Sequence, residues 1–506
     1  MKSTLLLCAA FLVIICRLCA QNIYCDEINE VLKSSTAFPF GVASGDPTNN
    51  SVVLWTAINP FRIAKTLEVQ IQVSEKEDFS ELVYLGLQSI SANTGYTVKI
   101  NVRDIEAGKK FYYRFIYDGV YSDTGITKTI DDNPSDLTFA VVSCSNYEWG
   151  FFNAYASIAK IKDLEAVIHL GDYIYEYQPD QYGNKKLSRK HVPAQEIKET
   201  MDYRSRYAQY RLDPSLQELH RVVPFITVWD DHEIANDAYK EGAQNHQPEE
   251  GSWENRKKNA RQVYFEWMPL QNNADYSIQR NFHFGDLADL FMLDGRLEGR
   301  TKQVASVDDP NRKDSTRTML GLQQRDWLMR EISHSSARWK LIGNQVIFSS
   351  FNLPTQLSKY GKSMDMWEGY PYERDLLLNQ WHEQNKKDII ILTGDVHASF
   401  CMDLRYDIND QNTSIGAEWV TPSITSASLD EYIATWKTKI AENKLSAREL
   451  NPHLKYVNFR DHGYMLVELT KDEAKATWYF EKNILKDKPA AVKNFTHVLS
   501  HSTQEY

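Results

Sequence analysis

The sequence has few cysteines, and their positions exclude a disulfide-rich scaffold. Of the six cysteines in 506 residues, three lie within the first 19 positions. The other three, Cys25, Cys144 and Cys401, are an odd number and lie far apart in the chain. A disulfide framework needs an even set at regular spacings, so at least one of these thiols is expected to be unpaired. An unpaired thiol is a candidate metal ligand.

The sequence also lacks long apolar runs, apart from residues 5–16, which follow Lys2. A membrane-spanning helix needs about 20 apolar residues, so this run is too short to cross a bilayer. Its positive start and small final residues are typical of a secretory signal peptide, which we predict for residues 1–20, with cleavage between Ala20 and Gln21. We therefore expect export to a periplasmic or extracellular location, without a transmembrane anchor.

An excess of positive charge is absent as well. The formal net charge of −11 becomes −13 when Lys2 and Arg17 leave with the signal peptide, because no acidic residue leaves with them. Such a chain is not expected to bind nucleic acids or anionic membranes through a basic surface.

Residues 37–132 have the pattern of a small all-β unit. Short alternating segments rich in β-formers are separated by Gly, Asn and Asp turns. Their spacing predicts an immunoglobulin-like or fibronectin-like β-sandwich of about 100 residues. The alternative is that these strands belong to a larger continuous sheet. The polar residues 131–136, which include Pro134, mark the boundary to the next domain.

Residues 136–485 alternate apolar runs with helical segments. The runs of buried-strand type cover residues 139–142, 166–170, 225–229, 290–293, 340–342 and 389–392. This alternation predicts a buried sheet flanked by helices, and so an α+β fold class for the whole chain. The last residues, 486–506, are polar and are expected to form a C-terminal tail, either as a covering helix or as a loose segment.

Four of these runs are followed by a thiol, carboxylate or imidazole side chain, the types that bind metals in proteins. Cys144 follows the first run, Asp172 the second, Asp231 the third, and Asp395 and His397 the last. Ligands bind beyond the carboxyl ends of the strands in open sheets, so these stretches are expected to converge. Each has an ordinary alternative, namely a buried small thiol, a turn, a helix N-cap or a surface turn. Because a coincidence of all four is much less expected, we predict one metal site.

The donor types of this site divide into two kinds. Tyr175, three residues after Asp172, can place a phenolate beside the same ion. A phenolate and the thiolate of Cys144 are strong anionic donors, which favours Fe³⁺ over Zn²⁺ at that position. Asp231 and Asp395 offer hard oxygen, which suits Ca²⁺, Mg²⁺ or Mn²⁺.

Two further positions complete the predicted ligand set. Asn344, which follows the run at 340–342, is a further candidate on the oxygen side, with Gln345 as its alternative. Asp172 has two carboxylate oxygens and is the natural bridge between the two ions.

At these residues the sequence resembles the alkaline phosphatase D (PhoD-like) family of metallophosphoesterases, which is related to the purple acid phosphatases. The most specific stretches are GDYIY at 171–175, WDDHE at 229–233, GNQV at 343–346 and LTGDVH at 392–397. FGVASGDP at 40–47 and LDGR at 293–296 support them. The resemblance covers nearly the whole mature chain.

The resemblance implies an N-terminal β-sandwich followed by a metallophosphatase domain, an αββα sandwich of two sheets flanked by helices. It also implies how the ions are held. Fe³⁺ would bind Cys144, Asp172, Tyr175 and His397, and one or two Ca²⁺ would bind the shared Asp172 with Asp231 and Asp395. Another divalent metal could take the second site.

The implied activity is the hydrolysis of small or polymeric phosphomonoesters and phosphodiesters by a metal-bound hydroxide. We expect His232 to be catalytic, as general acid or as hydrogen-bond donor to phosphate; the alternative is a structural residue at a helix start. His169 is expected to be a core histidine, and Arg296 and Arg300 either contact phosphate or pack internally. Competing functions are a phospholipase, a cell-wall phosphodiesterase, and a non-catalytic binding protein with structural metals.

Overall fold

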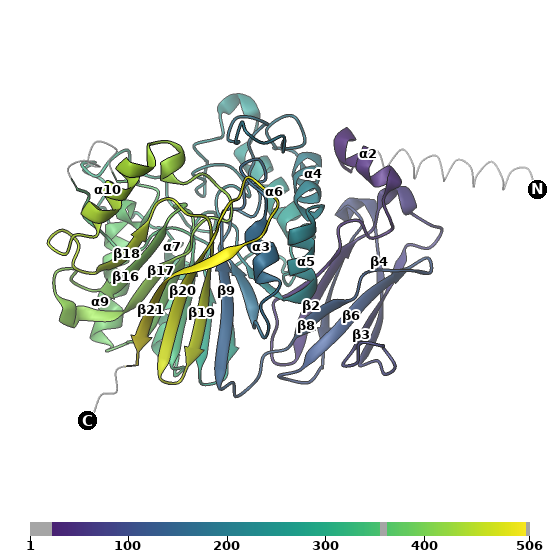
Figure 1. Cartoon of the computed structure of the whole chain (residues 1–506), viewed down its shortest axis with the longest axis horizontal. Helices are drawn as coiled ribbons and strands as arrows, with labels where there is room; N and C mark the ends of the chain where they lie inside the picture. The colour runs from purple at the N-terminus through teal and green to yellow at the C-terminus, as the bar shows by residue number, and fades with distance from the viewer. Residues whose placement is uncertain (1–22, 355–361, 502–506) are drawn as a thin grey trace, which may run out of the picture.

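The computed structural model describes residues 23–354 and 362–501, and it contains two central β-sheets and a smaller N-terminal sheet (Figure 1). The predicted signal peptide at residues 1–20 lies outside the described residues. In the described part of the chain, none of the helices combines the length and the apolar character needed to cross a membrane.

The first central sheet has nine strands in the order β21-β20-β19-β9-β10-β11-β1-β2-β5. In that order they are Ala491–Ser500, Glu473–Glu481, Gly463–Thr470, Asp136–Val142, Ala166–His169, Phe225–Thr227, Val42–Gly45, Ser51–Ala57 and Thr97–Arg103. Strands β9, β10 and β11 pair in parallel. Their carboxyl ends therefore point to the same edge of the sheet.

Strand β1 joins the N-terminal part to this sheet. It pairs in parallel with β11, with Gly45 opposite Phe225. A Cβ atom at Gly45 would lie 2.3 Å from the carbonyl oxygen of Pro269 and 2.5 Å from that of Phe225, so only glycine allows this close approach. The N-terminal strands β1, β2 and β5 thus extend the central sheet. For these three strands, the alternative of a larger continuous sheet therefore holds.

The second layer of the N-terminal unit is a five-stranded sheet. Its order is β4-β3-β6-β7, with β8 paired to β6. The strands are Tyr84–Ser89, Glu68–Ser74, Lys110–Tyr117, Val120–Tyr121 and Gly125–Lys128. The predicted N-terminal β-sandwich is confirmed, and one of its two sheets is continuous with the larger domain.

The second central sheet has seven strands in the order β12-β13-β14-β15-β17-β16-β18. They are Arg280–Phe284, Ala288–Met292, Trp339–Asn344, Ile389–Thr393, Ser414–Val420, Ser399–Arg405 and Leu454–Asn458. Strands β13, β14, β15 and β17 pair in parallel. Strand β15 is completely buried, which explains its unbroken apolar run.

The two central sheets pack face to face around a shared core. The rings of Phe139 in β9 and Phe284 in β12 lie 5.1 Å apart. The indole N–H groups of Trp339 and Trp478 donate across the interface to the carbonyl oxygens of Thr470 and Val420, at 2.7 and 2.9 Å. Buried indoles with satisfied N–H groups contribute apolar area without an unpaired donor.

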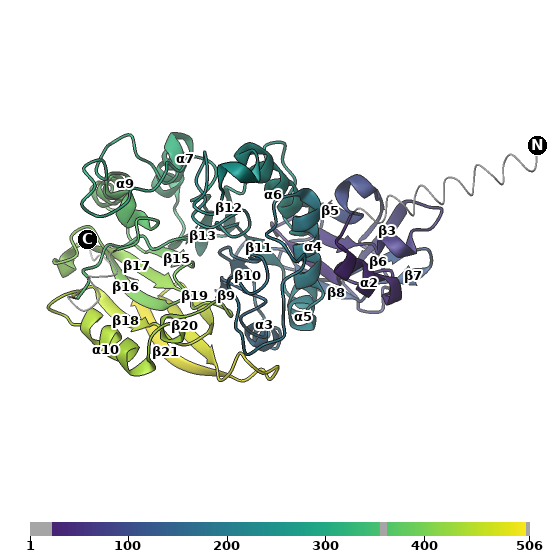
Figure 2. The ribbon, with the colours of Figure 1, turned by 90° about the horizontal axis from the view of Figure 1, so that it is seen from above.

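Helices cover the outer faces of both sheets (Figure 2). The α-helices of the described residues are α2 (Asp26–Ser34), α3 (Asn153–Ile158), α4 (Thr200–Arg211), α5 (Pro214–Val222), α6 (Trp253–Trp267), α7 (Gly321–His334), α9 (Pro371–Glu383) and α10 (Thr435–Leu445), of which α2 lies beside the N-terminal unit. Figure 2 shows α7 and α9 outside the seven-stranded sheet and α3 outside the nine-stranded one. The predicted α+β class, with two sheets between helical layers, is confirmed. Short 3-10 helices cover Pro60–Arg62, Ala92–Thr94, Pro248–Glu250, Trp367–Gly369, Gln411–Thr413 and Leu429–Glu431.

The C-terminal residues differ from the expectation of a covering helix or a loose segment. Ala491–Ser500 form β21, which pairs antiparallel with β20 at the edge of the nine-stranded sheet. All of its side chains are at least partly exposed, so it lacks the apolar run that identifies buried strands.

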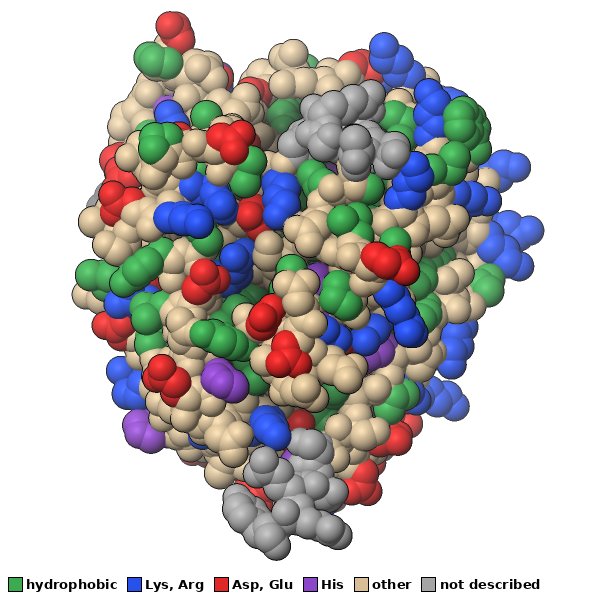
Figure 3. Space-filling model, turned by 90° about the vertical axis from the view of Figure 1, so that its left-hand side faces the viewer, with side chains coloured by type: hydrophobic (Ala, Val, Ile, Leu, Met, Phe, Trp, Pro, Cys, Tyr) green, Lys and Arg blue, Asp and Glu red, His purple; other side chains and the backbone are tan. Residues whose placement is uncertain are grey.

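At the end of the molecule seen in Figure 3, acidic and basic side chains are mixed across the surface.

Candidate metal centre

Seven residues that follow the ends of four strands, β9, β10, β11 and β15, form one continuous cluster of potential metal ligands. Within the described part of the chain, three groups each hold ligand atoms within 4.8 Å of one another. The groups are Cys144 with Asp172 and His397, then Asp172 with Asp231 and His232, then Asp230 with Asp231 and Asp395. Asp172 belongs to the first two groups and Asp231 to the last two. The structure therefore brings together the strand-end residues that the sequence singled out, and adds Asp230.

Four of these residues have a left-handed backbone in the turns that follow strands β9, β10 and β15. The φ angles are +61° at Cys144, +54° at Asp172, +61° at Asp395 and +53° at His397. Residues other than glycine rarely adopt this conformation, which costs of order 1–3 kcal/mol and is concentrated at functional sites. The fold holds these side chains in place at an energetic cost.

The thiol–phenol half of the centre consists of Cys144, Tyr175 and His397. The Tyr175 hydroxyl donates to Asp172 Oδ2 at 3.0 Å and lies 3.2 Å from His397 Nε2. Ser426 Oγ donates to the Tyr175 oxygen at 2.5 Å. Burial, reinforced by the nearby Asp172 carboxylate, raises the pKa of both the Tyr175 phenol and the Cys144 thiol. These donors need a strongly charged cation to ionise, so the set fits such an ion.

The carboxylate half consists of Asp230, Asp231 and Asp395, which surround the fully buried Arg296. Arg296 Nη2 lies 3.0 Å from Asp395 Oδ1 and 3.5 Å from Asp231 Oδ1, and Nε donates to Asp230. Burial and the neighbouring acids raise the pKa of Asp395 well above its usual value, and that of Asp230 to about 6.

Two oxygens of this half have no hydrogen-bond partner among the described residues. They are Oδ2 of Asp230 and Oδ1 of Asp231, both fully buried. Buried carboxylate oxygens are normally paired, and leaving them unpaired is costly. One guanidinium does not satisfy three carboxylates, so the carboxylate half also fits a cation.

Glu176 holds His232 in place within the cluster. Its Nδ1 lies 2.7 Å from Glu176 Oε2, and its backbone N–H donates to Asp172 Oδ1 at 3.4 Å. Its ring centroid lies 4.2 Å from that of Tyr175. Burial alone would raise the pKa of Glu176. The positive charge of His232 and the hydrogen bonds from His232 and Asn245 outweigh burial and lower this pKa to about 2. Glu176 was missed in the sequence, although it follows the GDYIY stretch directly.

Glu233 fixes the backbone of two ligand-bearing turns and was also missed. Its carboxylate accepts from the N–H groups of Asp172, Tyr173 and Asp230, at 3.0, 2.7 and 2.8 Å. The last residue of the WDDHE stretch thus ties the ends of β10 and β11 together.

Asn344 lies at a strand end, but its amide is already engaged. Nδ2 donates to the carbonyl oxygen of Val346 and to Thr393 Oγ1, and Oδ1 accepts from Trp367 Nε1 at 3.1 Å. The alternative, Gln345, likewise uses both amide atoms, with Nε2 donating to the Trp229 carbonyl at 3.0 Å. We include neither among the proposed ligands.

The remaining candidates have internal partners. His169 Nε2 lies 2.9 Å from the Tyr155 hydroxyl in the core. Arg296 and Arg300 are both fully buried and pair with Asp365, at 2.7 and 2.5 Å. These contacts favour the packing role for the arginines.

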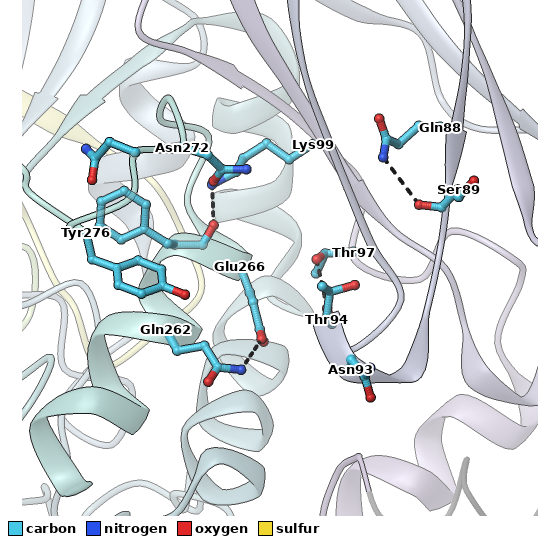
Figure 4. A pocket seen from close by; sticks show the side chains of 12 residues that line it. Gln88, Ser89, Asn93, Thr94, Thr97, Lys99, Gln262, Glu266, Asn272 and Tyr276 are labelled. Carbon is cyan, nitrogen blue, oxygen red and sulfur yellow. Dashed lines mark hydrogen bonds between the residues drawn. The ribbon is translucent and has the colours of Figure 1, made fainter.

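A cavity of about 410 Å³ lies elsewhere, between the N-terminal unit and α6 (Figure 4). Its charged groups are engaged: Lys99 Nζ donates to the Phe265 carbonyl, and Glu266 accepts from Arg204 at 2.7 Å. None of the candidate metal ligands lines it. The first of these contacts, between Lys99 in β5 and Phe265 in α6, joins the two parts of the chain.

Comparison with known proteins gives matches over both parts of the chain. The family described as PhoD-like phosphatase matches residues 139–478, and the family described as PhoD-like phosphatase, N-terminal domain, matches residues 26–131. Alkaline phosphatase D of Bacillus subtilis (strain 168) is 35% identical over 483 residues, which cover 91% of this chain and 80% of that protein. The solved structure titled "Structure of PhoD" is 33% identical, with a TM-score of 0.83, and the match covers 92% of this chain and 91% of that one.

Proposed function

We propose that this chain, which belongs to the PhoD-like phosphatase family and is a phosphoric ester hydrolase, hydrolyses phosphomonoesters and phosphodiesters after export from the cell. The observation that carries the proposal is the continuous ligand cluster, in which Asp172 is shared by two groups of ligand atoms. A shared carboxylate is what a site for two adjacent ions requires. Export is inferred from the signal pattern in residues 1–20.

We assign the two halves of the centre to different ions. Fe³⁺ is proposed for the thiol–phenol half with Asp172, because phenolate and thiolate donors favour a highly charged ion. Ca²⁺, or another divalent metal that prefers oxygen, is proposed for Asp231 and Asp395 with the shared Asp172. Arg296 supplies a further, fixed positive charge in the carboxylate half.

When bound, the ions would lower the pKa of a water molecule to make it a nucleophile and would neutralise charge on the phosphoryl oxygens. His232 is the residue proposed for proton transfer. Because its Nδ1 is engaged by Glu176, Nε2 is the ring atom left to donate to the leaving alcohol or to a phosphate oxygen. No side-chain nucleophile is required.

The proposal is tested by a substrate panel coupled to metal analysis. Purified protein is assayed with p-nitrophenyl phosphate, bis-p-nitrophenyl phosphate and a phospholipid, before and after chelation. We expect turnover of the first two, loss on chelation, and iron together with a divalent metal in the protein. Preferred turnover of the phospholipid would replace the proposal with the phospholipase alternative. Metal-loaded protein that turns over none of them would favour a binding protein with structural metals.

A further inference from the structure

A row of aromatic side chains leads away from the two histidines of the centre. The Tyr177 ring lies 5.3 Å from the ring of His232. The Tyr182 ring lies 6.5 Å from that of His397, nearly parallel at 16°, and 5.6 Å from Tyr177. Tyr177 and Tyr182 are partly exposed. The row therefore begins at the residue proposed to donate to the leaving alcohol.

The row continues to the surface through residues from distant segments. The Trp149 ring lies 5.3 Å from Tyr182, and the Tyr432 ring lies 6.3 Å from Trp149. Trp149 is fixed in place by its Nε1–H, which donates to Glu431 Oε1 at 2.8 Å. Tyr432 is 62% exposed, so packing alone does not account for this end of the row.

We propose that Tyr177, Tyr182, Trp149 and Tyr432 form a subsite for the alcohol group of the ester, and that it selects alcohols carrying a ring. The inference rests on the proposed function, because it uses the role of His232 on the leaving-group side. Aromatic faces bind ring faces by stacking and offer no positive charge to a second phosphate. The subsite would therefore recognise a flat or apolar ring face, which the sugar of a sugar phosphate and the base or sugar of a nucleotide both offer.

The ring orientations indicate how such a group lies. Trp149 is tilted by 40° against Tyr182 and by 43° against Tyr432. Successive rings are therefore tilted against one another and do not form one parallel stack. A ring attached to the ester oxygen through a short link can lie against these faces while its phosphate remains at the metal centre.

The test compares esters of primary alcohols with and without a ring. Glucose 6-phosphate and thymidine 5′-monophosphate carry a ring, and glycerol 1-phosphate carries none. For Tyr432→Ala we expect the selectivity, taken as the ratio of kcat/KM for ring esters to kcat/KM for glycerol 1-phosphate, to fall about tenfold, mainly through KM. Tyr432→Phe, which keeps the ring, should retain it. Trp436→Ala is the matched control, because Trp436 is also 62% exposed but stands on α10 and is not one of the four residues of the row.

The outcomes separate the subsite from the proposed function. A fall for only one ring ester identifies that ring as the preferred source, and a fall for both supports ring recognition in general. An unchanged selectivity in Tyr432→Ala, or an equal change in Trp436→Ala, overturns the subsite. If the wild type turns over none of the esters, the proposed function fails. Calorimetric titration of thymidine 5′-monophosphate into wild type and Tyr432→Ala then decides the subsite alone, since equal affinities reject it.

Discussion

The thiol–phenol half and the carboxylate half of the centre obtain their charge in different ways. In the first, burial keeps the Cys144 thiol and the Tyr175 phenol protonated, so negative charge develops only when an ion binds. In the second, the carboxylates of Asp230, Asp231 and Asp395 surround the guanidinium of Arg296, which supplies a fixed positive charge although burial raises the pKa of Asp395 here as well. We therefore expect the thiol–phenol half to need a strongly charged ion to ionise its donors, and the carboxylate half to accept a divalent ion beside the fixed charge of Arg296.

Removing the carboxylate that both halves share should have the largest effect. In Asp172→Asn we expect a loss of kcat/KM of at least about a thousandfold, because both ions lose a ligand and the two sites are no longer bridged. Metal analysis should show that iron and the divalent ion both fall. Asp326→Asn, an exposed position on α7, is the control. Loss of only one metal would mean that Asp172 is not shared.

Removing the fixed charge of the carboxylate half should affect stability. In Arg296→Met the buried acids lose their cation, which is expected to cost about 3–5 kcal/mol in the free energy of unfolding of metal-depleted protein. Denaturant unfolding with and without added Ca²⁺ measures it. Added Ca²⁺ should recover part of the loss, since an ion can replace the guanidinium. No dependence on Ca²⁺ would contradict a cation site there.

Chelation should separate the two halves. With EGTA we expect activity to fall about a hundredfold while iron and its visible absorption remain, because oxygen ligands hold divalent ions less tightly than phenolate and thiolate hold Fe³⁺. Added Ca²⁺ should restore activity. Full activity after exhaustive chelation would reject the two-metal centre.

The smallest effect on rate is expected for the phenol. Tyr175→Phe should lower kcat about tenfold, because one ligand of four is lost while the ion stays bound. It should also abolish the phenolate part of the charge-transfer band, whereas Cys144→Ala should shift what remains. Visible spectra of iron-loaded protein measure both. A colourless, iron-free wild type with full activity would show that the thiol–phenol half holds another ion.

The sequence predicted those parts of the fold and site that follow local rules. Buried strands have apolar runs, and parallel strands end together, so Asp172 and Asp231 could be placed in one cluster. The partners supplied by loops were not predictable in this way. Asp365, which pairs with Arg296, lies in a loop and does not follow an apolar strand, so the strand-end rule could not identify it. Asn344 occupies the expected strand end, but Trp367 engages its amide, and no sequence pattern identifies that contact.

The pairing of β1 with β11 limits where this chain can be cut. A fragment beginning at residue 136 would lose β1, and the N–H and C=O groups along that side of β11 would become an open edge prone to aggregation. Asp231 lies only four positions beyond Thr227, the last residue of β11, so the loosened strand would also carry a proposed ligand. Two family descriptions divide the sequence between residues 131 and 139. Because the sheet crosses that boundary, we expect the two parts to be stable only when expressed together and to unfold in one transition.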